Sequence, residues 1–358
     1  MVQFGTNMKK LSTRHVVILD TIKSHGRVSS GFIFDQSGAD TSERTIKRDL
    51  AELVDCGYLT TVGGGRSLEY ELTFAGRLFL PVDVDTYSDT DLDTRTGVCE
   101  KYEMTIWEQW PDNLFSAAEQ TVCADAAASY DAASADQSAD AHKRELERFV
   151  IEMSWKSSQI EGNTYTLLDT ELLLKEGVVS DKHTPEETQM ILNHKAAFEF
   201  TMKNKQLFST GLSVALVEEV HKILMQGLLE DIGIRKSLVG ITGSRYQPLD
   251  NQHQIKEALQ ALITVVNQTD DVFSQALTTL VGISYIQPFV DGNKRTARLV
   301  TNALLFAGGR APLSYRDVDE RAYRANLLVF YEQLSIVPMK KMFVSQYLFS
   351  TKHYTGLG

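Results

Sequence analysis

The chain has 358 residues, of which 43% are hydrophobic and 23% are charged. At roughly 150 residues per domain, this length allows about two domains that can each bury a core, and the composition excludes a chain that is disordered throughout. The 36 Lys and Arg residues against 47 Asp and Glu give a formal net charge of -11, which argues against a protein whose whole surface coats nucleic acid or an anionic membrane.

Residues 1–80 show the pattern of three helices followed by a hairpin. Helices are expected over 15–25, over 30–34 and from 41 to 56, and strands over 58–62 and 68–72. Gly26 and Gly57 stand where the first and third helices must end, and a Gly-rich turn separates the two strands. This order is typical of a winged helix-turn-helix, to which we assign the segment.

Four basic residues of this segment lie where such a domain contacts DNA: Arg44, Lys47, Arg48 and Arg66. The first three lie on the third helix, away from its apolar stripe, and this helix would enter a major groove of DNA. The fourth lies at the tip of the hairpin, where it would contact a DNA phosphate. The alternative is a solvated helix face on a small protein-interaction domain. We favour DNA as the partner, because the basic residues follow the docking geometry.

The periodicity is lost between residues 81 and 141. Asp alternates with small residues over 83–93, and 123–141 consists almost entirely of Ala, Ser and Asp. Between them, the aromatic residues of 102–114 are expected to pack on the domain that follows. We therefore predict that 81–141 is an acidic, Ala/Ser-rich linker.

The next segment, 142–350, has the apolar spacing of a helical domain. Helices are expected over 146–160, 184–200, 212–229 and 255–266. Thr184-Pro185-Glu186-Glu187 is a capping box with proline in the first helical position, so it marks one helix start. The sequence of 241–248 predicts a short hairpin, with Gly243-Ser244 as a type II′ turn. The fold class that follows is mainly α with one short β-hairpin.

One loop joins an apolar helix to the start of the next helix and suggests specific chemistry. Pro288 and Gly292 bracket this loop, and the following helix begins near Asn293. Unpaired N–H groups and the positive end of the helix dipole then favour an anion. Three fixed positive charges follow: Lys294, Arg295 and Arg298. Asp291 offers a hard oxygen ligand for Mg²⁺, so the loop favours a nucleotide polyphosphate with magnesium.

The string from Gln287 to Arg298 resembles the signature of the Fic (Fido-domain) family, His-x-Phe-x-Asp/Glu-Gly-Asn-Gly/Lys-Arg-x-x-Arg. Members of that family mostly transfer AMP from ATP to a hydroxyl side chain of a target protein. The string from Ser157 to Asn163 is similar to the family's inhibitory-helix motif, and 241–248 is similar to its target-binding flap. The resemblance implies a helical Fic core over 142–350, and the first 80 residues resemble a companion domain of some Fic-like proteins.

The resemblance also assigns roles to single residues. ATP would be bound by Gly292, Asn293, Lys294, Arg295 and Arg298. The catalytic positions would be Gln287, Asp291, Asn293 and Arg298. Asp291 would hold Mg²⁺, and a target protein would add a strand to the flap at 241–248. Glu161, supported by Ser157, would pair with Arg298 and take up the positive charge that the γ-phosphate needs.

Gln287 departs from the family pattern, because it stands where the family has its general base, a histidine. An amide is no usable proton sink, and losing a general base costs about 10²–10⁴ in rate, or roughly 3–5 kcal/mol of barrier. One hypothesis is therefore a weak or impaired protein adenylyltransferase that Glu161 inhibits. The other is a non-catalytic, nucleotide-sensing transcriptional regulator that binds DNA.

The sequence also bears on where the protein acts. It contains no apolar run long enough for a membrane span and no secretory signal at its start, so we expect a cytoplasmic protein without a membrane partner. The oligomeric state is left open, with a homodimer as one alternative.

Overall fold

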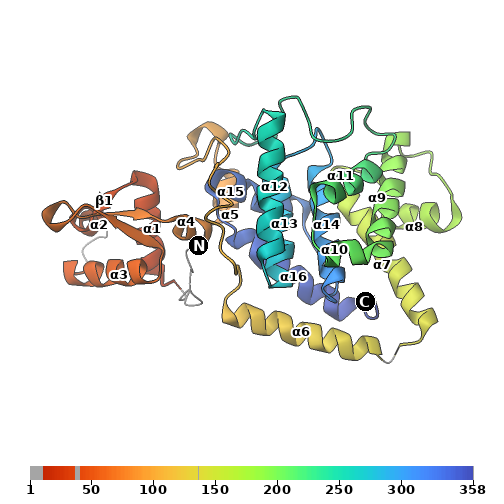
Figure 1. Cartoon of the computed structure of the whole chain (residues 1–358), viewed down its shortest axis with the longest axis horizontal. Helices are drawn as coiled ribbons and strands as arrows, with labels where there is room; N and C mark the ends of the chain where they lie inside the picture. Colours follow the sequence, from red (N-terminus) through yellow and green to blue (C-terminus); the bar gives the residue numbers. More distant parts are fainter. Residues whose placement is uncertain (1–10, 37–40, 136, 358) are drawn as a thin grey trace.

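The computed structural model describes residues 11–36, 41–135 and 137–357. The protein is mainly helical and has one small antiparallel sheet (Figure 1). This fold class is the one that the sequence predicts. Every helix in the described part of the chain lacks either the length or the apolar character needed to cross a membrane. The sheet lies at one end of the molecule, and a larger helical body forms the other end (Figure 1).

The N-terminal unit consists of three helices and a three-stranded sheet. In chain order its elements are α1 (Thr13–His25), β1 (Val28–Ser29), α2 (Ser30–Gln36), α3 (Glu43–Asp55), β2 (Leu59–Val62) and β3 (Glu69–Leu72). The strand β3 lies between β1 and β2 and is antiparallel to both. Ser12 and Ser42 cap α1 and α3, and Gly26 ends α1 at a φ of 74°. The expected helices and hairpin are present, whereas β1 is too short to give a periodic signal.

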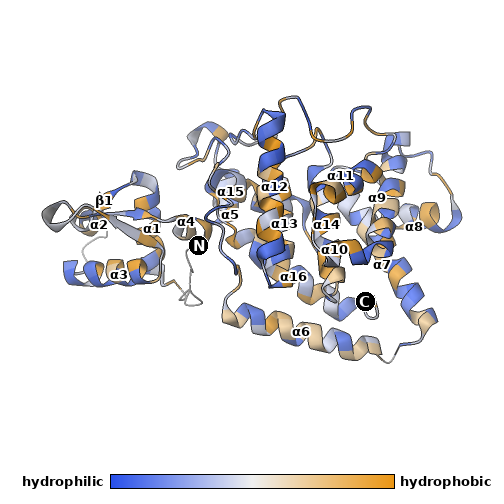
Figure 2. Cartoon of the chain, in the orientation of Figure 1, coloured by the Kyte–Doolittle hydropathy of each residue, from blue (hydrophilic) through white to orange (hydrophobic). Residues whose placement is uncertain are grey.

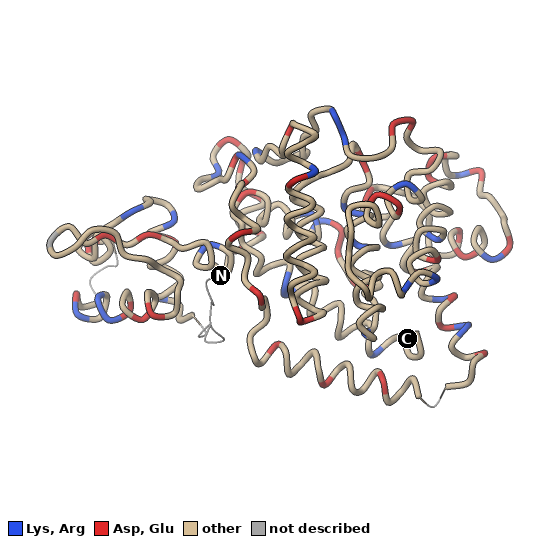
Figure 3. The backbone as a smooth tube through the Cα atoms, in the orientation of Figure 1, with Lys and Arg blue, Asp and Glu red and all other residues tan. Residues whose placement is uncertain are grey.

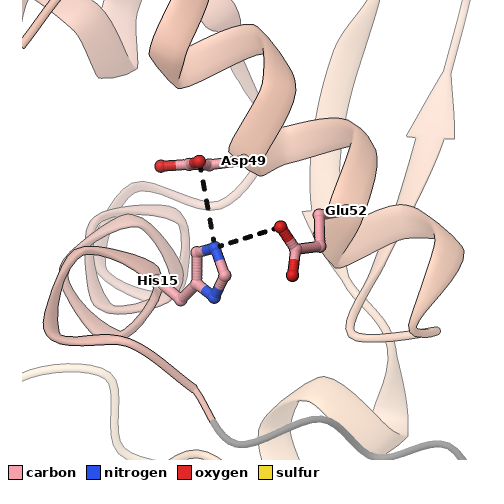
Figure 4. Close-up of side chains that lie close together, drawn as sticks. All are labelled: His15, Asp49 and Glu52. Carbon is pink, nitrogen blue, oxygen red and sulfur yellow. Dashed lines mark ion pairs between the residues drawn. The ribbon is translucent and has the colours of Figure 1, made fainter.

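A polar contact joins α1 to α3 (Figure 4). Nε2 of His15 lies 4.0 Å from Oδ1 of Asp49 and 4.0 Å from Oε2 of Glu52. These side chains bring their donor atoms close enough together for a metal ion. The buried carboxylate of Asp49, however, is already paired with Arg14 and Arg48. The ion pair between Arg14 on α1 and Asp49 on α3 therefore joins the two helices.

The predicted linker, 81–141, contains helix and core contacts that its composition did not indicate. It holds α5 (Val84–Asp89) and α6 (Ala117–Ala135), and it follows α4 (Phe74–Leu78). Alanine has the highest helix propensity, so an Ala-rich run forms a helix once one face has a partner. Here Cys123 and Tyr130 are buried, and α6 packs on α16 (Val337–His353). Aromatic residues of 102–114 are buried as expected: Tyr102, Trp107 and Trp110.

The larger body is helical and is centred on α13. Its helices are α7 (Ala139–Gln159), α8 (Leu167–Glu176), α9 (Pro185–Lys203), α10 (Lys205–Ser209), α11 (Val214–Leu224), α12 (Gln252–Gln268), α13 (Val272–Ile286), α14 (Asn293–Ala307), α15 (Glu320–Gln333) and α16. Thr184 and Glu187 form the expected capping box at the start of α9. Since α13 is apolar on nearly all sides, it is buried between α12 and α14 (Figure 2). This packing fixes the junction of α13 and α14.

The hairpin expected at 241–248 is not formed, because these residues, all of them described, contain no strand. A turn closes between Ile241 and Ser244, with an N···O distance of 3.0 Å. Gly243, at a φ of 78°, is the third residue of this turn, so the turn is not of type II′. The prediction failed because two amides that a hairpin would pair internally donate to distant segments instead.

Candidate functional site

The loop between α13 and α14 has a constrained backbone. Gln287 ends α13 in the left-handed region at a φ of 51°, and Gly292 precedes α14 at a φ of 78°. A Cβ on Gly292 would come within 2.7 Å of the Sδ atom of Met225, so glycine is required there. No side chain in the described structure caps α14 at Gly292, and the first N–H groups of that helix have no intrahelical partner. This helix start has the features of an anion site.

Gln287 and Asn293 are held by each other and by the loop. Nδ2 of Asn293 donates to Oε1 of Gln287 at 3.0 Å and to the Phe289 carbonyl at 2.9 Å. Nε2 of Gln287 donates to the Ser284 carbonyl at 2.6 Å. The buried Arg235 donates from Nε to the main-chain carbonyl of Gln287 at 2.7 Å. Both ends of the Gln287 amide group are therefore engaged within the protein.

Arg298 is fully buried and meets two residues from the end of α7. Its Nε donates to Oγ of Ser157 at 3.0 Å, and its Nη2 donates to Oε1 of Glu161 at 2.9 Å. Nζ of Lys294 donates to Oε2 of Glu161 at 2.9 Å. Burial by itself would raise the pKa of Glu161, but Arg298 and Lys294 outweigh this effect and lower the pKa to about 2. Glu161 is therefore an ionised carboxylate bound between two cations.

Arg295 is also buried, and its partner is more exposed. Nη2 of Arg295 donates to Oδ2 of Asp291 at 2.8 Å, and the Asp291 side chain is 63% exposed. Among the described residues, Nε and Nη1 of Arg295 and Nη1 of Arg298 have no hydrogen-bond partner. Buried guanidinium groups normally satisfy their donors, so these three nitrogens suit an anion. Asp291 pairs with Arg295 through Oδ2, but its carboxylate is exposed, so a divalent cation, which prefers oxygen ligands, can reach it.

Two buried histidines lie beside the motif. The ring of His221 stacks on Phe289 with centroids 3.6 Å apart, and its Nε2 lies 3.0 Å from the carbonyl oxygen of Asp291. Burial lowers the pKa of His221 to about 4, so the neutral ring donates from Nε2 to that carbonyl. Burial, together with Arg298, lowers the pKa of His194 to about 3. Isolated histidines give no spacing signal, so sequence analysis could not assign His221 to this loop.

The fold thus brings residues of both motifs together and places the region 241–248 beside the loop. Glu161 and Lys294 meet although 133 positions separate them in the sequence. The region 241–248 contacts α13 through Tyr246, whose hydroxyl donates to the Tyr285 carbonyl at 2.9 Å. The carbonyl lies only two residues before Gln287, so the flap region is anchored next to the loop.

The basic residues predicted to contact DNA lie in the N-terminal unit. Arg44, Lys47 and Arg48 are exposed on α3, where Lys47 pairs with Glu43 at 2.6 Å. The side chain of Arg66 lies outside the described structure. Elsewhere Lys and Arg are interspersed with Asp and Glu (Figure 3). The three described residues are therefore accessible on α3, where Glu43 pairs with Lys47 and Asp49 pairs with Arg48.

Residues 211–305 match the sequence profile of the Fic/DOC family. Over this stretch the chain is similar to the Fic/DOC family. Over 178 residues it is 28% identical to protein adenylyltransferase fic-1 of Caenorhabditis elegans, a match that covers 48% of this chain and 34% of that protein. Over 184 residues it is 24% identical to protein adenylyltransferase Fic of Nematostella vectensis, covering 51% and 43%. The chain therefore matches less than half of the length of these relatives.

Solved Fic structures share the fold of about two thirds of this chain. The structure of Fic-1 (residues 134–508) from C. elegans superposes with a TM-score of 0.59 at 22% identity, covering 66% of this chain and 72% of that chain. A Fic domain containing signaling protein from Bacteroides thetaiotaomicron superposes with a TM-score of 0.55 at 19% identity, covering 64% and 95%. At these identities the likeness concerns the fold alone, and it confirms the mainly helical fold class.

Proposed function

We propose that this chain binds ATP with Mg²⁺ at the amino end of α14 and is a cytoplasmic protein adenylyltransferase, inhibited by Glu161 and slowed by Gln287. One observation carries the proposal: Glu161 pairs with Arg298 and Lys294 beside a helix start that favours anions. The relatives named protein adenylyltransferases support AMP transfer as the class of reaction.

The residues of the loop fit a triphosphate. Asn293 and the first amides of α14 would hold the α-phosphate, while Gly292 leaves room for close backbone approach. Arg295 and Arg298 would hold the outer phosphates, since both have guanidinium nitrogens without a partner among the described residues. Asp291 would hold Mg²⁺, which neutralises phosphate charge when it is bound.

Glu161 occupies the cations that the outer phosphates would need. Its two oxygens accept from Nη2 of Arg298 and from Nζ of Lys294, and Ser157 accepts from Nε of Arg298. A γ-phosphate would have to replace charge-assisted hydrogen bonds, each worth about 1.5–3 kcal/mol. ATP binding is therefore weakened while Glu161 remains in place.

Gln287 limits the transfer step. In the proposed reaction, a target hydroxyl loses its proton to water as its oxygen attacks the α-phosphorus, and the bond from that phosphorus to pyrophosphate breaks. Gln287 stands at the position of the base, but its amide cannot take up that proton, and its Oε1 already accepts from Asn293. Without general-base assistance the rate falls by about 10²–10⁴.

Four versions of the full chain test the proposal: unaltered, Glu161→Gly, Gln287→His and the double variant. Each is incubated with α-labelled ATP, Mg²⁺ and a protein extract, and ATP binding is measured separately by calorimetry. We expect weak labelling with Glu161→Gly and labelling at least about 100-fold stronger with the double variant. Arg298→Ala in the double variant is the control and should abolish labelling.

The outcomes separate the hypotheses. Labelling by the Glu161→Gly variant supports an enzyme that works slowly without a histidine. ATP binding without labelling by any version would refute the transferase and favour a nucleotide-sensing protein. Failure of every version to bind ATP would refute both.

The N-terminal unit supports a second candidate function, a non-catalytic transcriptional regulator that senses nucleotide and binds DNA. The specific observation is that Arg44, Lys47 and Arg48 are all exposed on α3, in the same unit as the hairpin that contains Arg66. We expect Arg48→Ala to weaken binding to double-stranded DNA and to reduce its salt slope by about one. Arg321→Ala, which removes an arginine with a 78% exposed side chain, is the control. Equal binding by both variants would exclude DNA recognition by α3.

A further inference from the structure

A second set of contacts joins two segments that we name the strap (residues 95–101) and the flap (residues 241–248). Nη1 of Arg95 donates to the Gly243 carbonyl at 2.8 Å. In return, Nη1 of Arg245 donates to the Arg95 carbonyl at 3.2 Å. Both segments lie near α15 (Figure 1). The two arginines therefore tie the strap to the flap in both directions.

The main chains of the strap and the flap also pair. The Gln247 amide donates to the Glu100 carbonyl at 2.7 Å, and Lys101 and Gln247 form an isolated parallel bridge. The Glu100 side chain pairs with Arg245. The strap thus lies along the flap as one short added strand would.

One buried carboxylate holds both segments. Oε1 of Glu332, on α15, accepts from Oγ of Ser244 at 2.8 Å and from the Arg245 amide at 2.7 Å. Oε2 accepts from the Tyr87 hydroxyl at 2.7 Å and lies 3.3 Å from Nη1 of Arg95. The side chains of Arg95 and Glu332 are 6% and 0% exposed. A charge buried this deeply needs its partners. Removing the Arg95 side chain therefore weakens the contacts that fix the strap to Glu332 and to the flap.

These contacts use the backbone groups that strand addition requires. An extended peptide that pairs with the flap would bond to its N–H and C=O groups. The Gly243 carbonyl already accepts from Arg95. The amides of Arg245 and Gln247 already donate to Glu332 and to the strap. A groove of about 490 Å³ runs beside the flap, and one residue of the strap lines it.

We propose that the strap is an intramolecular occupant of the flap and competes with an extended segment of a target protein for the same backbone groups. This inference rests on the proposed function, because it concerns the surface that would receive the target. The strap is a second restraint beside Glu161. Glu161 weakens binding of the nucleotide, whereas the strap weakens binding of the target protein.

The test uses the strap itself as the probe. A fluorescein-labelled peptide of residues 94–103, with Cys99→Ser, is titrated with the full chain, unaltered or carrying Arg95→Ala, and anisotropy is recorded. The peptide supplies the arginine that the variant lacks, so we expect it to bind Arg95→Ala at least tenfold more tightly than the unaltered chain. A peptide carrying Arg95→Ala should lose this gain. Arg321→Ala in the full chain is the matched control and should bind like the unaltered chain.

Amide hydrogen exchange gives an independent measurement. Exchange at the Gln247 amide should become at least tenfold faster in Arg95→Ala and stay unchanged in Arg321→Ala. If Arg95→Ala does not fold, Glu100→Ala replaces it, because the Glu100 side chain is 47% exposed and forms its ion pair with Arg245 of the flap. Equal peptide affinity for the unaltered and strap variants, or unchanged exchange at Gln247, would overturn the inference.

The two proposals fail in different ways. Neither peptide binding nor amide exchange needs ATP or AMP transfer, so both remain informative if the chain transfers no label. If label is transferred but the strap variants bind the peptide no better than the unaltered chain, the strap inference alone is wrong.

Discussion

Replacing Glu161 by glutamine tests whether an ionised carboxylate stabilises the cluster around Arg298. The substitution keeps the size of the side chain and removes its charge. Burial acts against the ionised form, but Arg298 and Lys294 prevail and lower the pKa of Glu161 from its ordinary 4.5 to about 2. At about 1.4 kcal/mol per pKa unit, the ionised form contributes about 3 kcal/mol to the free energy of unfolding at neutral pH.

The sign of the pH dependence follows from the direction of the shift. Because folding lowers this pKa, the contribution is fully present above about pH 4.5 and is lost as the pH falls toward about 2. The unaltered chain should therefore be about 3 kcal/mol more stable than Glu161→Gln at pH 7, and this difference should fall to less than about half near pH 3.

Urea unfolding followed by tryptophan fluorescence measures this difference, and Trp155 reports on the same helix as the cluster, α7. Glu171→Gln is the matched control, because the Glu171 side chain is 45% exposed and its pair with Lys175 lies on the surface. The control should change stability by less than about 1 kcal/mol at either pH. A Glu161→Gln difference that is the same at pH 7 and pH 3 would refute the reasoning.

Three further predictions concern the loop. Glu161→Gly should raise ATP affinity at least about tenfold, because phosphate no longer competes with a carboxylate; calorimetry that finds equal affinity would contradict this. His221→Phe should lower ATP affinity by about fivefold, or about 1 kcal/mol, because the Asp291 carbonyl loses its hydrogen-bond donor. Because the pKa of His221 is about 4, the ATP affinity of the unaltered chain should show no step from this histidine between pH 6 and 8. Gly292→Ala should destabilise the chain by about 1–3 kcal/mol in thermal unfolding, because a Cβ there would clash at positive φ, whereas Gly64→Ala, with open space around it, should be nearly neutral.

Local signals predicted much of the fold. The start of a helix depends on residues three or four positions apart, so the Thr184 capping box could be read from the sequence. Two features depend on distant partners and could not be read. The Ala-rich helix α6 needs α16 as a surface to pack on, and the amides of 241–248 bond to Glu332 and to the strap. The first was predicted as linker and the second as a hairpin.

In the candidate site, too, some contacts were predicted and others were not. The resemblance to the Fic family implied that Ser157, Glu161 and Arg298 would meet, and the contacts are present. The ion pair between Lys294 and Glu161 was not predicted. A long cationic side chain reaches the nearest carboxylate in space, and here that carboxylate belongs to a residue far away in the sequence. Arg295 likewise turns to Asp291, four residues earlier on the same loop and helix.

One helix, α15, contacts both the cluster around Glu161 and the strap. We therefore ask whether these two restraints are energetically coupled. Tyr323 lies under the guanidinium of Arg298 at 5.1 Å, while Glu332 holds the strap and the flap. Nine residues separate these positions, or about 13 Å along a helix, and the described contacts show no partner shared by Glu161 and Arg95. Sites that far apart without a shared partner usually add within about 0.5 kcal/mol.

We therefore expect the double variant Glu161→Gly and Arg95→Ala to lose as much unfolding free energy as the two single variants together. Urea unfolding of the four chains completes this double-mutant cycle. Arg321→Ala combined with Glu161→Gly is the control, because Arg321 is exposed on the same helix. A coupling energy above about 1 kcal/mol would contradict this expectation. It would mean that α15 shifts when either restraint is removed, so that one movement of α15 would open both the nucleotide site and the flap.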